Sequence, residues 1–237
     1  MTGSELKSIA RKLMFENSPR LFFISLLYVA IGACVSWFTV TLPGSIDLDN
    51  LYQRLSSGEM FNITMIYRNF RLPGVFLALL FSLFQPIFDI GFMSYCLKIF
   101  RKQETTYKDI LNGFLIFVKV LMLFLVITVF VMLWSFLLIV PGIIAAYRYR
   151  LAYYILLDDT SKGILQCIKE SSTIMYGSKV DLFIIELSFF GWYLLDVLLF
   201  MLMPFPFTIP IISIWISPYL GLTKVGFYEE RLRKLAT

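Results

Sequence analysis

Long apolar runs separated by short polar stretches dominate this chain. Most runs are close to the length of about 20 residues that an α-helix needs to cross a bilayer. The run from residue 113 to 157 is about twice as long, and it therefore predicts two helices joined by a turn near residues 135–141. The pattern predicts six transmembrane helices, at about residues 21–42, 72–97, 113–135, 138–157, 182–203 and 211–228.

Two shorter segments have apolar residues on only one side of a helix. Residues 4–17 combine such an apolar stripe with three basic residues on the other side. Residues 160–177 are polar but also keep an apolar stripe at helical spacing. Thr160 or Ser161 can cap the start of the second helix, and Gly177 can close its end. Amphipathic helices of this kind lie in the membrane surface. We therefore predict an all-α fold, a polytopic membrane helix bundle of six transmembrane and two interfacial helices in a single domain.

The composition supports this class and argues against most enzymes. Hydrophobic residues make up 59% of the chain and charged residues 16%, against about 25% charged residues in soluble domains. Histidine is absent, which removes the commonest general base and the commonest metal ligand. The three cysteines form no metal-binding spacing, and the chain has neither a phosphate-binding loop nor a dinucleotide-binding motif. We expect no enzymatic activity, no metal and no cofactor.

The net charge of +5 comes from basic residues beside the apolar runs, so it indicates orientation in a membrane rather than nucleic-acid binding. Lys and Arg number four before the first run, four in residues 98–112, three in 158–180 and four from Lys224 onward, against three in 43–71 and none in 204–210. Because basic loops stay in the cytoplasm, we predict that both termini are cytoplasmic.

Four segments of the chain resemble a known family. They are SELKSIARKLMFEN at 4–17, PGIIAAYRYRLAYYILLDD at 141–159, SSTIMYGSKVDLFIIELSFFGW at 171–192 and SPYLGLTKVGFYEERL at 217–232. The chain is similar to the bacterial integral membrane family catalogued as domain of unknown function 975. One departure is MPFPFTIP at 203–210, in place of the usual glycine-rich approach to the last span. The resemblance implies a bacterial cytoplasmic membrane protein and supplies no activity.

Charged and phenolic side chains within the predicted spans are the candidate functional residues. A charged side chain at the centre of a bilayer costs about 2.5–3.5 kcal/mol, so it faces the interior of a bundle or a water-filled cavity. The candidate ligand-binding residues are Asp89, Lys119, Arg148, Arg150, Glu186, Tyr193 and Asp196.

Their depths predict a charged layer near one membrane surface. With a rise of about 1.5 Å per residue, three cations and two anions lie in the cytoplasmic half, while Asp196 lies in the outer half. Arg148 and Arg150 point to nearly opposite sides of a helix. We predict that one of them pairs with Glu186 or Asp89 and that the other extends to the membrane surface.

Three interpretations of this layer remain open: structural ion pairs, a cavity for an anionic or amphipathic ligand, and a proton or ion relay through Glu186 and Asp196. We favour a non-enzymatic binding or accessory protein in the lipid bilayer, whose charged cavity engages a lipid, a membrane-active peptide or a membrane-protein partner. The alternative is a small secondary transporter or channel that works as an oligomer.

Overall fold

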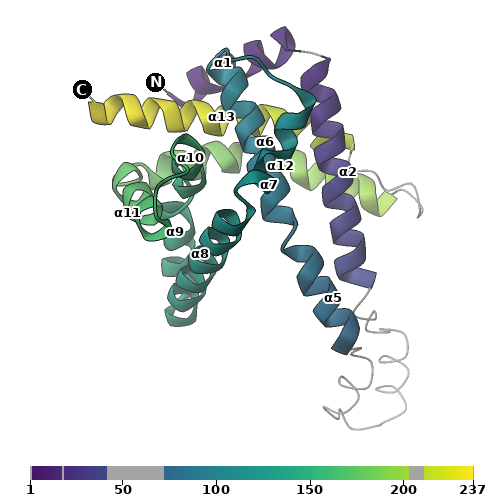
Figure 1. Cartoon of the computed structure of the whole chain (residues 1–237). Helices are drawn as coiled ribbons and strands as arrows, with labels where there is room; N and C mark the ends of the chain where they lie inside the picture. The colour runs from purple at the N-terminus through teal and green to yellow at the C-terminus, as the bar shows by residue number, and fades with distance from the viewer. Residues whose placement is uncertain (1, 18, 42–71, 203–210, 237) are drawn as a thin grey trace. The chain divides into compact units, whose positions relative to one another are not determined.

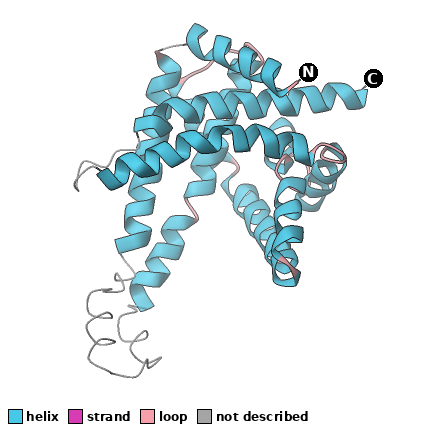
Figure 2. Cartoon of the chain, turned by 180° about the vertical axis from the view of Figure 1, so that it is seen from behind, coloured by secondary structure: helices cyan, strands magenta, loops and turns pink. Residues whose placement is uncertain are grey.

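The computed structural model describes residues 2–17, 19–41, 72–202 and 211–236, and within them every regular element is helical (Figure 1, Figure 2). An all-α fold is therefore confirmed for these residues. Residues 42–71, between the first two predicted spans, and residues 203–210, before the last one, lie outside the described residues. The elements are α1 (Gly3–Glu16), α2 (Arg20–Thr41), α5 (Leu72–Ser82), α6 (Gln85–Phe100), η1 (Tyr107–Leu111), α7 (Asn112–Leu115), α8 (Phe117–Leu137), α9 (Ile139–Arg148), α10 (Ala152–Asp158), α11 (Ile164–Ile174), α12 (Lys179–Leu202) and α13 (Ile211–Ala236).

Four stretches of helix among the described residues are long and apolar enough to cross a membrane, which makes the chain a membrane protein. They are Arg20–Phe38, Phe76–Phe100, Phe117–Leu137 and Lys179–Leu199. They coincide with the first, second, third and fifth predicted spans.

The two other predicted spans differ from the expectation. The fourth consists of two short helices, α9 and α10, separated by Tyr149–Leu151, so neither reaches the length of a span. The sixth lies in α13, whose mixture of apolar, small and polar residues excludes it from these four.

The helices form two compact units, which we describe separately. The smaller unit is Ala30–Gln85 and contains the second part of α2 together with α5. Within it, the rings of Phe38 and Phe81 stack with their centroids 4.8 Å apart. The larger unit is Met1–Val29 and Pro86–Thr237, and it contains all seven candidate residues.

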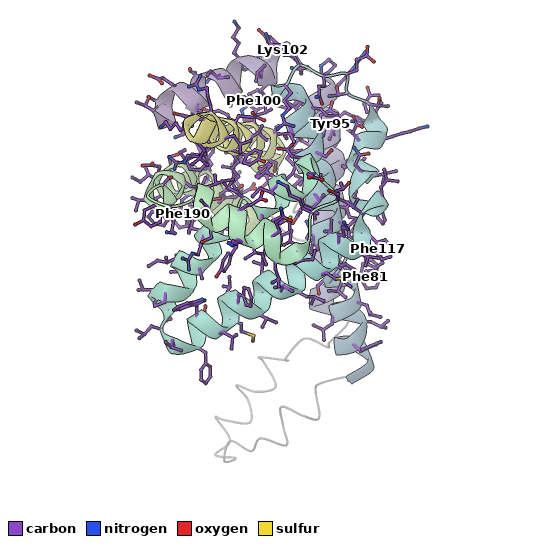
Figure 3. All side chains as sticks on the ribbon, turned by 60° about the vertical axis from the view of Figure 1, so that its left-hand side comes forward. Phe81, Tyr95, Phe100, Lys102, Phe117 and Phe190 are labelled. Atoms are coloured by element: carbon purple, nitrogen blue, oxygen red, sulfur yellow. The ribbon has the colours of Figure 1, made fainter. Side chains whose placement is uncertain are left out.

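Helix α13 organises the larger unit because it packs against both α1 and α12 (Figure 1). Gly226 of α13 allows a close approach, since a Cβ atom there would lie 3.1 Å from Phe100 and 3.3 Å from Leu6. Phe100 is labelled beside α13 in Figure 3. The apolar stripe of α1 is buried at Leu6, Ala10, Leu13 and Met14.

The apolar faces of both amphipathic helices are therefore covered by protein. In α11 the buried residues are Cys167, Ile168, Ser171 and Ile174, and this helix packs against α10, α8 and α13. An apolar stripe shows that one side of a helix avoids water, but it does not distinguish a membrane surface from a neighbouring helix. Both predicted ends of α11 differ from the structure, because Gly163 takes the N-cap position and Met175 the C-cap position. Gly177 lies two residues beyond Met175 and adopts a left-handed conformation, with φ +74°.

Helices α8 and α9 form the predicted hairpin. The turn is at Leu138, whose extended backbone separates the two helices, and this lies within the predicted interval of 135–141. Gly142 permits their contact, since a Cβ atom there would lie 2.0 Å from Ser135 Oγ. The turn is strongly exposed and apolar, with Phe136 93% exposed.

Asp109 holds the segment between α6 and α7 through a local polar network. Its carboxylate accepts hydrogen bonds from Lys98 Nζ at 2.7 Å and from the Thr106 N–H at 2.7 Å. Burial alone would raise the pKa of Asp109, but these bonds prevail and lower it below its ordinary value of 3.8.

We expect Asp109→Asn to destabilise the protein by about 1–3 kcal/mol, because it leaves Lys98 without its carboxylate. Since the folded-state pKa is depressed, Asp109 stabilises the fold above pH 3.8 and loses this contribution as the pH falls through its folded value. Thermal unfolding in detergent between pH 7 and pH 3 measures both effects. The matched control is Glu104→Gln, an exposed residue of the same loop. Equal losses in the two variants would contradict the prediction.

Candidate functional site

A cavity of about 350 Å³ lies within the larger unit. Helices α2, α6, α8, α10, α12 and α13 contribute to its wall, together with the segment between α9 and α10. Its polar residues include Tyr28, Asp89, Arg150, Tyr193 and Lys224, and its apolar residues include Ile90, Phe92, Phe124, Leu182 and Leu220. Three of the seven predicted residues, Asp89, Arg150 and Tyr193, therefore share one cavity.

An interrupted helix places Arg150 at this cavity. Helix α9 ends at Arg148 and α10 begins at Ala152, and both Arg150 and Leu151 line the cavity. The Ser171 hydroxyl donates to the Arg148 carbonyl at 2.9 Å, so a backbone acceptor at the end of α9 gains a partner. Non-helical backbone at membrane depth is tolerated where it is covered by protein or borders a cavity. In this interruption Tyr149 and Leu151 are buried, and Arg150 and Leu151 border the cavity.

Glu186 of α12 is the centre of an ion cluster beside the cavity. Its carboxylate lies 2.7 Å from Lys224 Nζ and 3.2 Å from Arg150 Nη2, and it accepts a hydrogen bond from the Tyr147 hydroxyl at 2.7 Å. The Glu186 and Lys224 side chains are only 19% and 17% exposed. The predicted pairing of one arginine with Glu186 is thus confirmed, with Arg150 as the partner.

Asp89 of α6 is held on another part of the cavity wall. Its carboxylate accepts a hydrogen bond from the Tyr28 hydroxyl at 2.9 Å. The Tyr28 ring stacks on Phe92, with centroids 4.5 Å apart and planes inclined by 13°. The ring contact fixes the direction of the hydroxyl, and Asp89 is therefore oriented by aromatic packing.

Lys119 does not belong to this cluster, contrary to the prediction, and Arg148 is the arginine of the pair that lies outside it. The Lys119 ammonium donates to the Thr160 carbonyl, because Lys119 lies in the first turn of α8 and its long side chain reaches the loop before α11. The Arg148 side chain is exposed and forms no ion pair with any residue that the structure describes. Of this arginine pair, only Arg150 faces the cluster.

Asp196 has a structural role at the start of α13. Its carboxylate accepts hydrogen bonds from the N–H groups of Ile212 at 3.3 Å and Ser213 at 3.1 Å, and from the Ser213 hydroxyl. The first turn of a helix has N–H groups without intrahelical partners and a partial positive charge, and a carboxylate satisfies both. The two residues of the possible relay are therefore divided, with Glu186 in an ion cluster and Asp196 at a helix cap.

Lys224 was missed as a member of the site. Lys224 is the single Lys, Arg, Asp or Glu within the predicted span 211–228, and this isolation is the signal that identifies it. The count of basic residues groups it instead with the C-terminal tail. With Lys224 included and Lys119 and Arg148 removed, the cluster has two cations, Arg150 and Lys224, and two carboxylates, Asp89 and Glu186. Among the residues that the structure describes, the four charges of this cluster balance, whereas the predicted layer of five charges had an excess of one positive charge.

A second polar network connects helix ends away from the cavity. Arg101, just after α6, lies 2.6 Å from Asp158 of α10 and 2.7 Å from Glu229 of α13. Tyr228 also donates to Asp158, at 2.7 Å. The hydrogen bond to Asp158 raises the pKa of Arg101 further above its ordinary value, and Glu229 adds to the effect. We interpret this network as a structural connection.

Comparison with known proteins identifies a family for part of the chain. Residues 136–235 match the family described as Protein of unknown function (DUF975), which confirms the resemblance over this segment. The matched segment includes Arg150, Glu186 and Lys224. No curated protein and no solved structure matches the chain.

Proposed function

We propose that this chain, which resembles a family of unknown function over residues 136–235, is a non-enzymatic membrane protein that binds the polar end of an amphipathic ligand. The observation that supports the proposal is the composition of the cavity wall. Arg150, Lys224 and Asp89 line it together with apolar side chains such as Phe92 and Leu220. A ligand with a charged end and an apolar body matches both kinds of surface.

The donors at the cavity suit an oxyanion. A lysine ammonium has three N–H donors and a guanidinium has five, so a single hydrogen bond from each to Glu186 leaves Lys224 and Arg150 with further donors. Their hydrogen bonds to an oxyanion would be charge-assisted and therefore strong. The volume of about 350 Å³ is at the lower end of the range for ligand sites, which suits a headgroup and its first carbons rather than a whole lipid.

The test is to identify what copurifies with the protein after gentle extraction in detergent. We expect mass spectrometry to detect an amphiphile bound to the wild-type chain and at least about tenfold less of it bound to Lys224→Gln. Lys169→Gln, an exposed lysine of α11, is the matched control and should retain the ligand. Equal retention by Lys224→Gln, or an empty wild-type protein, would refute the proposal.

We also propose that the chain lies in a bacterial cytoplasmic membrane with six spans and both termini in the cytoplasm. Six spans require α9–α10 together, and α13, to cross the bilayer in addition to the four apolar stretches. The distribution of Lys and Arg supports this topology. A four-span arrangement would also keep both termini on one side, but it would move residues 158–180 to the outside.

Cysteine labelling at position 169 distinguishes the two topologies. The background lacks Cys34, Cys96 and Cys167, and Lys169→Cys places one thiol on the exposed side of α11. We expect an impermeant maleimide to label this thiol only after the cells are opened, because six spans keep it in the cytoplasm. Labelling of intact cells would contradict six spans. A cysteine in the predicted external loop at 45–70 is the positive control.

The interrupted helix favours transport as the second candidate function. Transporters often bind their substrates where a transmembrane helix is broken, and here the Tyr149–Leu151 break borders the cavity. A carrier of this size would work as an oligomer or with a membrane-protein partner. Reconstituted vesicles separate the two functions: binding without flux supports the binding protein, and saturable uptake that depends on Glu186 supports the carrier.

A further inference from the structure

The charged groups that the structure describes at the cavity balance, and this balance limits the chemical class of the ligand. Arg150 and Lys224 are opposed by Glu186, which pairs with both, and by Asp89, which lines the cavity with them. We infer that the cavity is matched to a zwitterionic headgroup, in which a phosphate oxyanion and a cationic nitrogen are joined by a short linker. This inference rests on the proposed function and specifies its ligand.

The oxyanion end of such a headgroup would meet the two cations. Lys224 is on α13 and Arg150 lies between α9 and α10, so the two side chains reach the cavity from different elements. Both already bind the carboxylate of Glu186, so the two cationic side chains converge on one oxyanion group. A phosphate offers more acceptor oxygens than a carboxylate, and it can bind the remaining donors while Glu186 stays in place.

The cationic end would meet Asp89 and the aromatic side chains near it. Phe92 and Tyr28 stack beside Asp89, and Tyr153 and Tyr193 line the same cavity. A carboxylate can accept several hydrogen bonds, so the Tyr28 hydroxyl does not exhaust Asp89 as an acceptor. Aromatic faces also attract cations. Asp89 and these rings together form a site for an ammonium group.

The balance of charge disfavours a ligand with a net charge. An anionic headgroup would add an uncompensated negative charge to a group of two cations and two carboxylates, of which Lys224 and Glu186 are largely buried. A zwitterion adds none, because each of its ends meets an opposite charge. The apolar wall of the cavity then favours a lipid source for this headgroup over a free, water-soluble zwitterion.

Competition between defined lipids tests the inference. The purified wild-type chain in detergent is mixed with equal amounts of a short-chain phosphatidylethanolamine and a short-chain phosphatidylglycerol, and the bound lipid is counted by native mass spectrometry. We expect at least about tenfold more phosphatidylethanolamine to be bound. Equal binding, or a preference for phosphatidylglycerol, would overturn the inference of a zwitterionic headgroup and leave the proposed function unaffected. Binding of neither lipid would overturn both.

A variant of Asp89 tests whether this carboxylate causes the preference for phosphatidylethanolamine. Asp89→Asn removes the partner of the ammonium group and leaves the two cations, so the preference should disappear or reverse toward phosphatidylglycerol. Asp181→Asn, the same change at an exposed position of α12, is the control and should keep the wild-type preference. An unchanged preference in Asp89→Asn would overturn the assignment of Asp89. If Asp89→Asn does not fold, the wild-type competition still decides the inference. Free phosphoethanolamine that binds as well as the lipid would identify a soluble source.

Discussion

Gly91→Ala should destabilise the protein more than a change to alanine at any other glycine that the structure describes in a helix. Gly91 is on α6, and a Cβ atom there would lie 1.8 Å from the carbonyl oxygen of Ile110, a backbone atom that cannot rotate away. Gly113 makes the reciprocal contact, because a Cβ atom there would lie 2.0 Å from the Ile87 carbonyl oxygen. The backbones of α6 and the η1–α7 segment therefore touch at two glycines, as small residues allow in membrane helix packing.

Overpacking in a core costs about 1–3 kcal/mol when side chains can adjust, and a backbone clash leaves less freedom. We expect Gly91→Ala to lower the free energy of unfolding by about 3 kcal/mol or more, measured as loss of the folded fraction in detergent on heating or in denaturant. The displacement of α6 that relieves this clash should also change the cavity. Asp89, Ile90 and Phe92 flank Gly91 in α6, and all three line the cavity.

Gly191 provides the matched control, since it also lies in an apolar helix. A Cβ atom at Gly191 of α12 would meet no atom within 4 Å. Because alanine is a better helix former than glycine by about 1 kcal/mol, Gly191→Ala should leave the stability unchanged or increase it. If both variants unfold at the same temperature, then the close approach of α6 to Ile110 does not stabilise the fold.

The sequence predicted the helices well where periodicity and length determine them. The α8–α9 hairpin illustrates this, because an apolar run too long for one span requires a turn, and Leu138 lies within the predicted interval. The break at Tyr149–Leu151 was not predicted. It contains neither glycine nor proline, and the hydroxyl that donates to its preceding carbonyl comes from Ser171, 23 residues later. A tertiary contact supports this break, and local sequence does not show tertiary contacts.

The candidate site was predicted in part for a similar reason. The free-energy cost of a charge within a membrane correctly indicated Asp89, Arg150 and Glu186 as residues of the site. It does not show which partner a charge finds: Asp196 caps α13, while Lys119 reaches a carbonyl. Depth along an ideal helix could not separate these roles, since partners are set by how helices rotate about their axes when they pack.

Glu186→Gln should have the largest effect among substitutions of charged residues. It removes the shared carboxylate of Lys224 and Arg150 and leaves two cations facing each other with little water around Lys224. Removing one member of a buried ion pair costs about 3–5 kcal/mol. We expect about 3 kcal/mol, the lower limit of that range, because Arg150 is 48% exposed and partly hydrated.

The double variant Glu186→Gln/Lys224→Gln should recover part of this loss, because it removes a buried cation together with its partner. The cost of the pair should therefore be smaller than the sum of the single costs by about 1–3 kcal/mol in unfolding experiments. Arg148→Gln is the control, since Arg148 is exposed and has no ion pair among the described residues, and its combination with Glu186→Gln should be additive. Additive costs for Glu186 and Lys224 as well would mean that the cluster does not hold α12 to α13.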